Sequence, residues 1–240
     1  MLLAAGQATR LRPLTDNCPK CLLPVGPETI LARAIRILAS RGLKRFTVVD
    51  GFRGDLIREA LTTGFPGLDF TFVRNEDFTT TNNAWSLMLA CDALAGDEPV
   101  FLLDSDIVFE PEVIDRILDG GTANRLGLRT TGGVGDEEMK VRLDPAGRVA
   151  DLSKEMPPAA AAGESVGLEV FSAPTVTALA GVLDRRMKVE NRINEYYEAS
   201  FVELIQNGSE ILPVDLAGLR CMEIDTIEDL DHARREFSGS

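Results

Sequence analysis

The first half of the chain alternates short apolar runs with segments in which apolar residues recur at helical spacing. Branched and aromatic residues dominate the short runs, which favours buried β-strands, whereas the helical spacing favours amphipathic helices. This alternation is typical of βα units and a largely parallel sheet. The pattern predicts strands at residues 2–4, 46–49, 70–73 and 100–103, and helices at 29–40, 55–61, 82–94 and 113–118.

The second half of the chain has strand-like runs that follow one another with fewer helices between them, which favours antiparallel pairing. The alanine tract at 159–162 follows two prolines and is typical of a loop tip. We therefore predict one domain over residues 1–240, of the α/β class, with three α/β/α layers around a mixed, mainly parallel central sheet. The second-half pattern predicts strands at 126–129, 141–143, 149–152, 166–171, 211–214 and 220–224, and helices at 175–186, 193–206 and 227–236.

Charge and hydropathy then limit the partners. The 240 residues carry a formal net charge of −13, which disfavours nucleic acid and anionic membranes as partners. No apolar stretch approaches the ~20 residues of a membrane-spanning helix, and no basic segment precedes an apolar signal core. We therefore expect a cytoplasmic protein that binds neither nucleic acid nor membrane.

The cysteines and the histidine offer little chemistry. Cys18 and Cys21 form a CxxC pair, which suits either a metal or redox site or two incidental thiols beside a lysine. The second reading is favoured because the chain has no second pair and only one histidine, His232. His232 lies in a predicted C-terminal helix and is expected at the surface, so histidine acid/base catalysis is disfavoured.

A loop of small residues follows the first predicted strand. Small side chains and a glycine let backbone N–H groups approach an anion closely, which is the geometry that a triphosphate requires. Arg10 and Lys20 add two cations nearby. An ordinary strand-to-helix connection would share several of these features. The strand end and loop comprise Leu3, Ala4, Ala5, Gly6, Gln7, Ala8 and Thr9.

Aspartates follow two of the predicted strands. Asp104 and Asp106 come directly after the strand at 100–103. Ligands of open α/β sheets bind at the carboxyl ends of strands, and Mg²⁺ prefers carboxylate oxygens, although a polar strand exit would look the same. Asp225 ends a further strand, and because Thr226 can cap the following helix, Asp225 is left free for another role.

Residues 75–86 are rich in side-chain amides and hydroxyls, among them Asn82, Asn83 and Ser86. At the start of a helix such groups commonly act as caps, and capping alone would account for them. A ligand-binding role therefore needs a further indication.

Taken together, these strings resemble the nucleotidyltransferase superfamily, whose N-terminal signature runs leucine-alanine-alanine-glycine-x-glycine-x-arginine and later proline-lysine. The string around Asn82 is similar to the branch with phosphocholine and aminoethylphosphonate cytidylyltransferases. The resemblance implies a Rossmann-like fold in which residues 1–120 bind the nucleotide and 121–240 the acceptor. Two departures are visible: Ala8 replaces the usual second glycine, and the first strand begins almost at Met1, which leaves an incomplete N-terminus open.

The resemblance also implies a role for each charged motif. Arg10 would contact the leaving β- and γ-phosphates, and Lys20 would neutralise the α-phosphate and the attacking acceptor. Asp106 and Asp225 would hold the catalytic Mg²⁺. The nucleotide would further contact the residues of the small-residue loop together with Asn82, Asn83, Ser86 and Asp104.

The acceptor would bind in the second half of the chain. From the residues alone, Lys140 and Lys154 are expected at solvated surface positions, as most lysines are. Cys221 occupies a place where choline-type relatives commonly carry tryptophan, and a quaternary ammonium prefers an aromatic cage. This favours a primary amine, amino acid or polyol phosphate over phosphocholine. The acceptor residues implied by the resemblance are Lys140, Lys154, Glu164, Tyr197 and Glu198.

We therefore predict a Mg²⁺-dependent transfer of CMP from CTP to the phosphate or phosphonate of a small acceptor, with release of pyrophosphate. No histidine base is required, because the acceptor phosphate is ionised near neutral pH. A sugar-1-phosphate uridylyl-, guanylyl- or thymidylyltransferase is the alternative enzyme, and a catalytically silent nucleotide-binding regulatory subunit is the alternative from another class. The complete set of charged residues argues against the silent subunit. The sequence leaves open the acceptor, a firm base preference and a homodimer.

Overall fold

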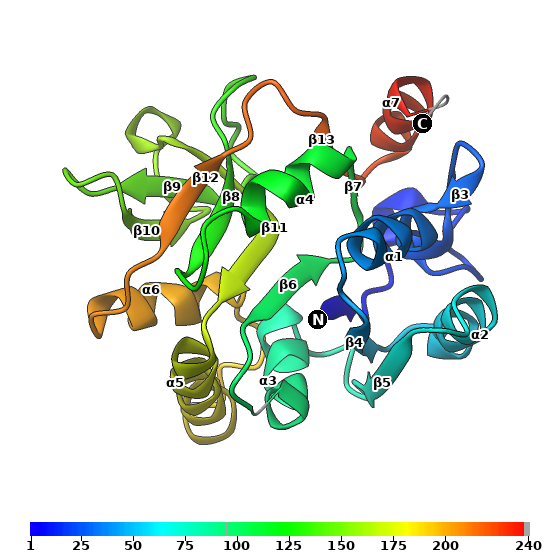
Figure 1. Cartoon of the computed structure of the whole chain (residues 1–240), viewed down its shortest axis with the longest axis horizontal. Coiled ribbons are helices and arrows are strands. Elements are labelled where there is room, and N and C mark those ends of the chain that lie inside the picture. Colours follow the sequence, from blue (N-terminus) through cyan, green and yellow to red (C-terminus); the bar gives the residue numbers. More distant parts are fainter. Residues whose placement is uncertain (95, 238–240) are drawn as a thin grey trace.

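Four parallel strands form the first half of the central sheet (Figure 1). The structure, a computed structural model, describes residues 1–94 and 96–237. The strands lie in the order β6, β1, β4, β5, and each neighbouring pair is parallel, so their carboxyl ends meet at one edge. They are β1 (Leu2–Ala4), β4 (Arg45–Asp50), β5 (Asp69–Arg74) and β6 (Val100–Asp104).

The long strand β11 (Gly163–Phe171) joins this parallel unit to an antiparallel one. It pairs antiparallel with β6 on one side and with β8 and β9 on the other, as the strand pattern of the second half predicted. β10 extends the sheet antiparallel beyond β9, and β12 pairs parallel with β8. These strands are β8 (Arg125–Arg129), β9 (Lys140–Leu143), β10 (Val149–Ser153) and β12 (Leu212–Asp215).

A bulge in β11 brings its backbone against the end of β6. The register with β8 shifts between Ser165 and Glu169, and Gly167 within the bulge has φ +67°. A Cβ atom at Gly167 would lie 2.8 Å from Asp104 Oδ2, so only glycine fits both the backbone angle and the space.

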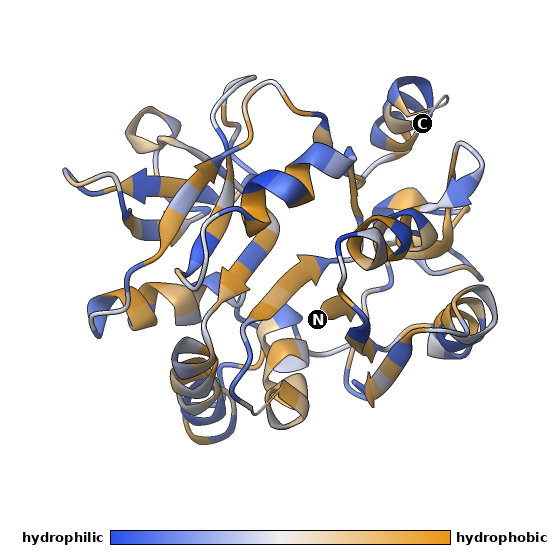
Figure 2. Cartoon of the chain, viewed as in Figure 1, coloured by the Kyte–Doolittle hydropathy of each residue, from blue (hydrophilic) through white to orange (hydrophobic). Residues whose placement is uncertain are grey.

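Helices lie on both faces of the sheet (Figure 1), and the strands between them consist largely of hydrophobic residues (Figure 2). Two separate clusters of buried apolar side chains form, one against each face, which confirms the predicted three-layer arrangement. Each fully buried aliphatic side chain stabilises the fold by about 1.5–3 kcal/mol. One cluster contains α1 (Ile30–Ser40), α2 (Gly54–Gly64) and α4 (Pro111–Leu118), and the other α3 (Asn83–Leu94), α5 (Ala173–Asp184) and α6 (Glu198–Gln206).

A short two-stranded ribbon carries the C-terminal part of the chain to the end of β6. β13 (Cys221–Glu223) pairs antiparallel with β7 (Ile107–Phe109), and Ile224 N–H donates to Asp106 O at 3.0 Å. The helix α7 (Ile227–Glu236) begins directly after it with a capping box between Thr226 and Asp229. The predicted Thr226 cap is therefore confirmed. The ribbon places Asp225, the residue before Thr226, near Asp106.

Some elements differ from the sequence prediction. The helix predicted at 193–206 begins only at Glu198, because the carbonyl groups of Ile193 and Asn194 accept hydrogen bonds from Asn82 instead of closing helical turns. The β2–β3 hairpin (Pro24–Val25 and Glu28–Thr29) and β7 were not predicted, since two or three residues carry too little periodicity. Within the described residues no helix combines the length and apolarity needed to cross a bilayer.

Candidate active site

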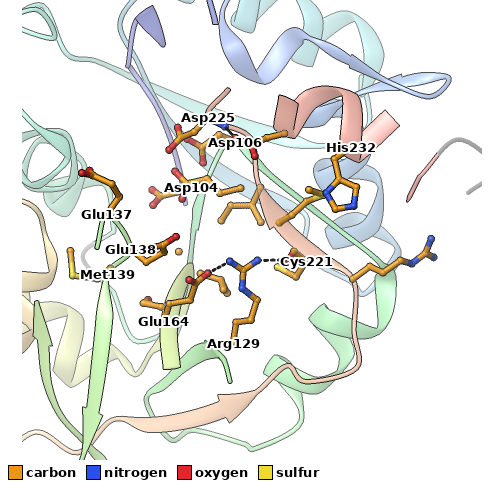
Figure 3. Close-up of a pocket in the computed structure, with 18 of the residues that line it drawn as sticks. Asp104, Asp106, Arg129, Glu137, Glu138, Met139, Glu164, Cys221, Asp225 and His232 are labelled. Atoms are coloured by element: carbon orange, nitrogen blue, oxygen red, sulfur yellow. Dashed lines mark hydrogen bonds and ion pairs between the residues drawn. The ribbon is translucent and has the colours of Figure 1, made fainter. Parts of the chain in front are cut away.

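Two cavities meet at the carboxyl edge of β1 and β6. The smaller one, of about 230 Å³, lies between the loop after β1 and the start of α3. The larger one, of about 880 Å³, lies over β11, β13 and the loop before β9 (Figure 3). Four side chains line both cavities and form a shared wall, namely Asn83, Asp104, Asp106 and Glu223.

The small-residue loop turns its backbone toward the smaller cavity. In the described part of the chain, the N–H groups of residues 6–9 donate to no protein acceptor. A Cβ atom at Gly6 would meet nothing within 4 Å, so the cavity is open at that point. Unpaired N–H groups beside an open cavity are typical of anion sites.

Ala8 adopts a left-handed backbone, with φ 48° and ψ 54°. Its carbonyl accepts from Thr15 Oγ1 at 2.8 Å, which holds the turn. The glycine usual at this position in the superfamily would adopt the same angles without steric cost, whereas an L-residue loses about 1–2 kcal/mol.

We expect Ala8→Gly to change the free energy of unfolding by less than about 1 kcal/mol, because relief of backbone strain is offset by the entropy of glycine. Ala8→Val should lower it by about 1–2 kcal/mol or more, since a β-branched residue is poorly tolerated at positive φ. Urea denaturation measures both variants. Equal stability of the valine and glycine variants would contradict a left-handed turn at Ala8.

Four charged side chains from distant parts of the chain meet at the shared wall. Lys20 Nζ lies 2.7 Å from Asp106 Oδ2 and 2.9 Å from Asp225 Oδ1, and Arg10 NH2 lies 2.6 Å from Asp225 Oδ2. Lys20 keeps only 13% of its side chain exposed, whereas Arg10 keeps 63% and can move toward a ligand. The structure thus brings Arg10, Lys20, Asp106 and Asp225 together.

The carboxylates among these residues fit a divalent cation. Asp106, Glu223 and Asp225 each offer an oxygen, and these atoms lie within 4.8 Å of one another. Asp106 Oδ1 is buried and has no hydrogen-bond partner within the described residues. An all-oxygen donor set with an unsatisfied carboxylate oxygen suits Mg²⁺. A bound cation would compete with the Lys20 ammonium for the same two aspartates.

Glu223 was not assigned to the site from the sequence. It lies two residues before Asp225 near the end of β13, and this spacing was the available signal. Withdrawal from water and the neighbouring Asp106 and Asp225 carboxylates raise the pKa of Glu223 to about 8. For Lys20, burial lowers the pKa, but the contacts with Asp106 and Asp225 outweigh burial and raise the pKa above its usual 10.5.

The start of α3 forms the polar wall of the smaller cavity. Asn75, only 1% exposed, donates from Nδ2 to Ser86 Oγ at 3.0 Å and to Thr81 Oγ1 at 3.2 Å. Asn82, Asn83 and Ser86 all line the cavity. Asn82 Oδ1 also accepts from the N–H of Asn83, the first residue of α3, at 2.8 Å, so Asn82 both contacts the helix start and lines the cavity.

The larger cavity contains three of the five predicted acceptor residues, Lys154, Glu164 and Glu198. The structure does not place Lys140 in this cavity. The residue is only 1% exposed, and its ammonium group donates hydrogen bonds to the carbonyls of residues 136, 138 and 154. Tyr197 is also fully buried, and its neighbour Tyr196 lines the cavity instead, with Lys154 Nζ 4.8 Å from its ring centroid.

The larger cavity holds carboxylates that lack full pairing. Glu138 Oε2, Glu164 Oε2 and Glu198 Oε2 are buried without a hydrogen-bond partner in the described residues. Arg129 pairs with the other oxygen of Glu164 and approaches the Cys221 carbonyl (Figure 3). Burial raises the pKa of Glu198 to about 7, against the smaller opposing effects of a backbone hydrogen bond and Lys154.

The comparison with protein families gives a match that covers all four parallel strands β1, β4, β5 and β6. The profile described as a MobA-like NTP transferase domain matches residues 1–135, which include the small-residue loop, Lys20, Asn83 and Asp106. The chain belongs to this family.

Relatives of this MobA-like chain include cytidylyltransferases. A CMP-5'-(3-aminopropyl)phosphonate synthase of Streptomyces rubellomurinus is 30% identical, over 99% of this chain and 38% of the relative. A 2-aminoethylphosphonate cytidylyltransferase of Lancefieldella rimae is 27% identical, over 96% of this chain and 87% of the relative. The chain thus spans well under half the length of the first relative.

Solved structures support the fold of the MobA-like chain. The CTP:phosphocholine cytidylyltransferase of Streptococcus pneumoniae superposes with a TM-score of 0.78 at 20% identity, over 98% of this chain and 96% of the other. The predicted Rossmann-like α/β fold is confirmed by this likeness.

Cys21 follows Lys20 in this MobA-like chain and its thiol is buried near Asp106, whereas His232 lines the larger cavity. Cys18 and Cys21 are free, and burial raises the pKa of Cys21 to about 12. His232 lies on α7 at the outer end of the larger cavity with its side chain 56% exposed. A buried thiol with a raised pKa carries little thiolate near neutral pH, and the thiolate is the reactive form.

Proposed function

We propose that this chain transfers CMP from CTP to a phosphate or phosphonate oxygen of a small acceptor and releases pyrophosphate. The observation that carries the proposal is the cluster of Lys20, Arg10, Asp106 and Asp225 at the wall between the two cavities. A reaction between two anionic substrates needs both positive charge and a place for each substrate at the point where they meet. The two named relatives add support for CTP and for phosphonate acceptors.

In this proposal each half of the chain takes one substrate. Residues 1–120 bind the nucleotide, with the phosphates against the N–H groups of residues 6–9 and the base or ribose near Asn82, Asn83 and Ser86. Residues 121–240 surround the acceptor in the larger cavity. The shared wall then lies between the α-phosphorus and the attacking oxygen.

The reaction forms one P–O bond and breaks another. An acceptor oxygen attacks the α-phosphorus in line and the bond to the β-phosphate oxygen breaks, so the electron pair leaves with pyrophosphate. Lys20 neutralises the α-phosphate and the acceptor, while Arg10 turns from Asp225 to the leaving phosphates. Asp106, Asp225 and Glu223 would hold Mg²⁺, which would supply charge neutralisation on the triphosphate.

A pyrophosphate-release assay tests the proposal. The chain is incubated with Mg²⁺, a panel of phosphorylated and phosphonate acceptors, and CTP, UTP, GTP or dTTP in turn. The proposal expects the highest kcat/KM with CTP. A preference for UTP, GTP or dTTP with a sugar 1-phosphate would favour the alternative enzyme, and binding without turnover of any pair would favour a silent regulatory subunit.

The carboxylate oxygens without a partner in the larger cavity favour an acceptor that carries a primary ammonium group. Glu198 Oε2 and Glu164 Oε2 are buried beside the larger cavity without partners, and a cation would satisfy them. Few aromatic residues line this cavity, and Tyr196 is the tyrosine among them. The lack of an aromatic cage disfavours a quaternary ammonium group.

We expect 2-aminoethylphosphonate to exceed the isosteric 2-hydroxyethylphosphonate in kcat/KM by roughly 10- to 100-fold, the usual value of one charged hydrogen bond. Glu198→Gln should reduce this ratio while the rate with the hydroxyl compound changes little. Glu59→Gln, at an exposed surface position, is the matched control. An unchanged ratio in Glu198→Gln would remove Glu198 from acceptor recognition.

A further inference from the structure

One segment of largely irregular backbone connects a residue of the smaller cavity with the lining of the larger one. Residues 193–198, here called the strap, lead from the region after α5 into the first residue of α6. The Ile193 carbonyl accepts from Asn82 N–H at 2.9 Å, and the Asn194 carbonyl accepts from Asn82 Nδ2 at 3.3 Å. At its other end the strap places Tyr196 and Glu198 in the lining of the larger cavity. The strap therefore links a residue of the smaller cavity to residues of the larger one.

Tyr197 lies in the strap and holds two side chains of the shared wall. Its N–H donates to Asn83 Oδ1 at 3.0 Å, and its phenol oxygen donates to Asp104 Oδ2 at 2.8 Å. Tyr197 has no exposed surface and lines neither cavity. Any effect of Tyr197 on a ligand must therefore act through Asn83, Asp104 or its neighbours in the strap.

The tyrosine ring is fixed by the core rather than by the cavities. Its centroid lies 5.0 Å from that of Phe201, within the apolar cluster under α3, α5 and α6. The strap itself is fastened by Arg186, which is 11% exposed and donates to Glu195 Oε2 at 2.8 and 3.0 Å and to Glu203 Oε2 at 2.9 Å. These contacts with the core and within the strap hold the phenol oxygen beside Asp104.

The Asp104 carboxylate has little freedom around this phenol. Gly167 in the β11 bulge lies so close that a Cβ atom there would be 2.8 Å from Asp104 Oδ2, the same oxygen that accepts from Tyr197. A ligand that displaces Asp104 or Asn83 would therefore shift Tyr197 through its two hydrogen bonds. The strap would pass this shift on to Tyr196 and Glu198. Packed elements of this kind transmit small displacements, because they do not deform freely.

We propose that Tyr197 is a positioning residue that couples nucleotide binding in the smaller cavity to acceptor binding in the larger one. The proposal rests on the proposed function, which supplies the two ligands. Nucleotide contacts at Asn83 act on the backbone of Tyr197, and the phenol holds Asp104 in the wall that both cavities share. The strap carries the effect to Tyr196 and Glu198, which line the larger cavity and not the smaller one. By thermodynamic linkage the coupling is reciprocal, so each ligand tightens the other by the same factor.

Titration calorimetry measures this coupling directly. The affinity for 2-aminoethylphosphonate is determined with Mg²⁺, in the absence and in the presence of saturating α,β-methylene-CTP, and the ratio of the two dissociation constants is the coupling factor. We expect a factor of roughly 10 for the unaltered chain, within the usual range for coupled sites. In Tyr197→Phe, which keeps the ring but lacks the hydroxyl, the factor should fall to about two or less while the nucleotide analogue alone binds within about threefold of its original affinity.

Two variants at Asn83 test the other contact. Asn83→Asp keeps an oxygen to accept from the Tyr197 N–H and should retain the coupling factor, whereas Asn83→Ala should lose it. Because each factor is a ratio within one variant, a change in nucleotide affinity at Asn83 does not enter it. Asn83→Ala also leaves the buried ring untouched, so it carries the test if Tyr197→Phe does not fold in a thermal melt.

The outcomes separate this inference from the proposed function. An unaltered chain that releases pyrophosphate but shows a factor of one would overturn the coupling alone. So would a Tyr197→Phe variant that keeps the original factor, or one that loses both affinities equally, as expected for a purely structural tyrosine. Absence of pyrophosphate release with every triphosphate would instead overturn the proposed function.

Discussion

Replacing Lys20 with methionine should reduce the rate of pyrophosphate release by about 10³-fold, the usual loss when a cation on a transferring phosphoryl group is removed. Methionine keeps the length of the side chain and its packing, but it cannot neutralise the α-phosphate or the acceptor. The lysine contacts both Asp106 and Asp225, whereas Arg10 contacts Asp225 and not Asp106 among the described ion pairs. The measurement is single-turnover release of pyrophosphate with saturating CTP and acceptor.

The same variant should bind Mn²⁺ or Mg²⁺ more tightly in the absence of nucleotide. The Lys20 ammonium lies within 3 Å of both aspartates, and its loss frees their oxygens for the cation. Lys44→Met, at an exposed position, is the matched control and should leave both the rate and the metal affinity unchanged. Near-normal turnover in the Lys20 variant, or weaker metal binding, would contradict the role given to this lysine.

Asp225→Asn should lower the rate by at least about 10³-fold, equal to about 4 kcal/mol of transition-state stabilisation. The amide keeps the shape of the side chain but removes the charge that a cation needs and that pairs with Arg10 and Lys20. Lys20 retains Asp106 as a partner, so the fold should persist. Calorimetric titration with Mg²⁺ and the nucleotide analogue should show metal binding weakened by a similar order of magnitude.

Asp231→Asn provides the control for that experiment. Asp231 lies on α7 a short distance along the chain from Asp225, is exposed, and contacts only Arg234 among the described ion pairs. Its variant should turn over at the original rate. If Asp225→Asn retained activity, or bound Mg²⁺ as tightly as the unaltered chain does, Asp225 could not be a metal-holding residue.

The alternation of strands and helices was predictable because each element carries its own apolar pattern. The strand at 100–103 and the cap at Thr226 follow from local residues alone, and the structure contains both. The meeting of Asp106 with Asp225 is different, because it depends on the β7–β13 ribbon, in which strands of three residues have no readable period. There, only the resemblance to a superfamily indicated proximity.

Two residues predicted in the acceptor half lie outside the lining of the larger cavity for a common physical reason. Lys140 and Tyr197 carry polar groups that sequence reasoning directs toward a ligand, yet both side chains are buried and satisfied by protein atoms. Which of two adjacent tyrosines faces a cavity is decided by the strap and the core around Phe201, and neither is encoded locally. Most of the strap was predicted as helix. Its irregular backbone could not be predicted locally, because it depends on hydrogen bonds with Asn82, more than a hundred residues away.

The shared wall also limits how this chain could be redesigned for a new substrate. Asn83, Asp104, Asp106 and Glu223 face both cavities, so a substitution there alters both ends of the reaction at once. Lys154, Glu164 and Tyr196 line the larger cavity and are absent from the lining of the smaller one. Libraries aimed at a different acceptor should therefore randomise these outer positions and leave the wall intact, which keeps the choice of acceptor separable from the handling of the triphosphate.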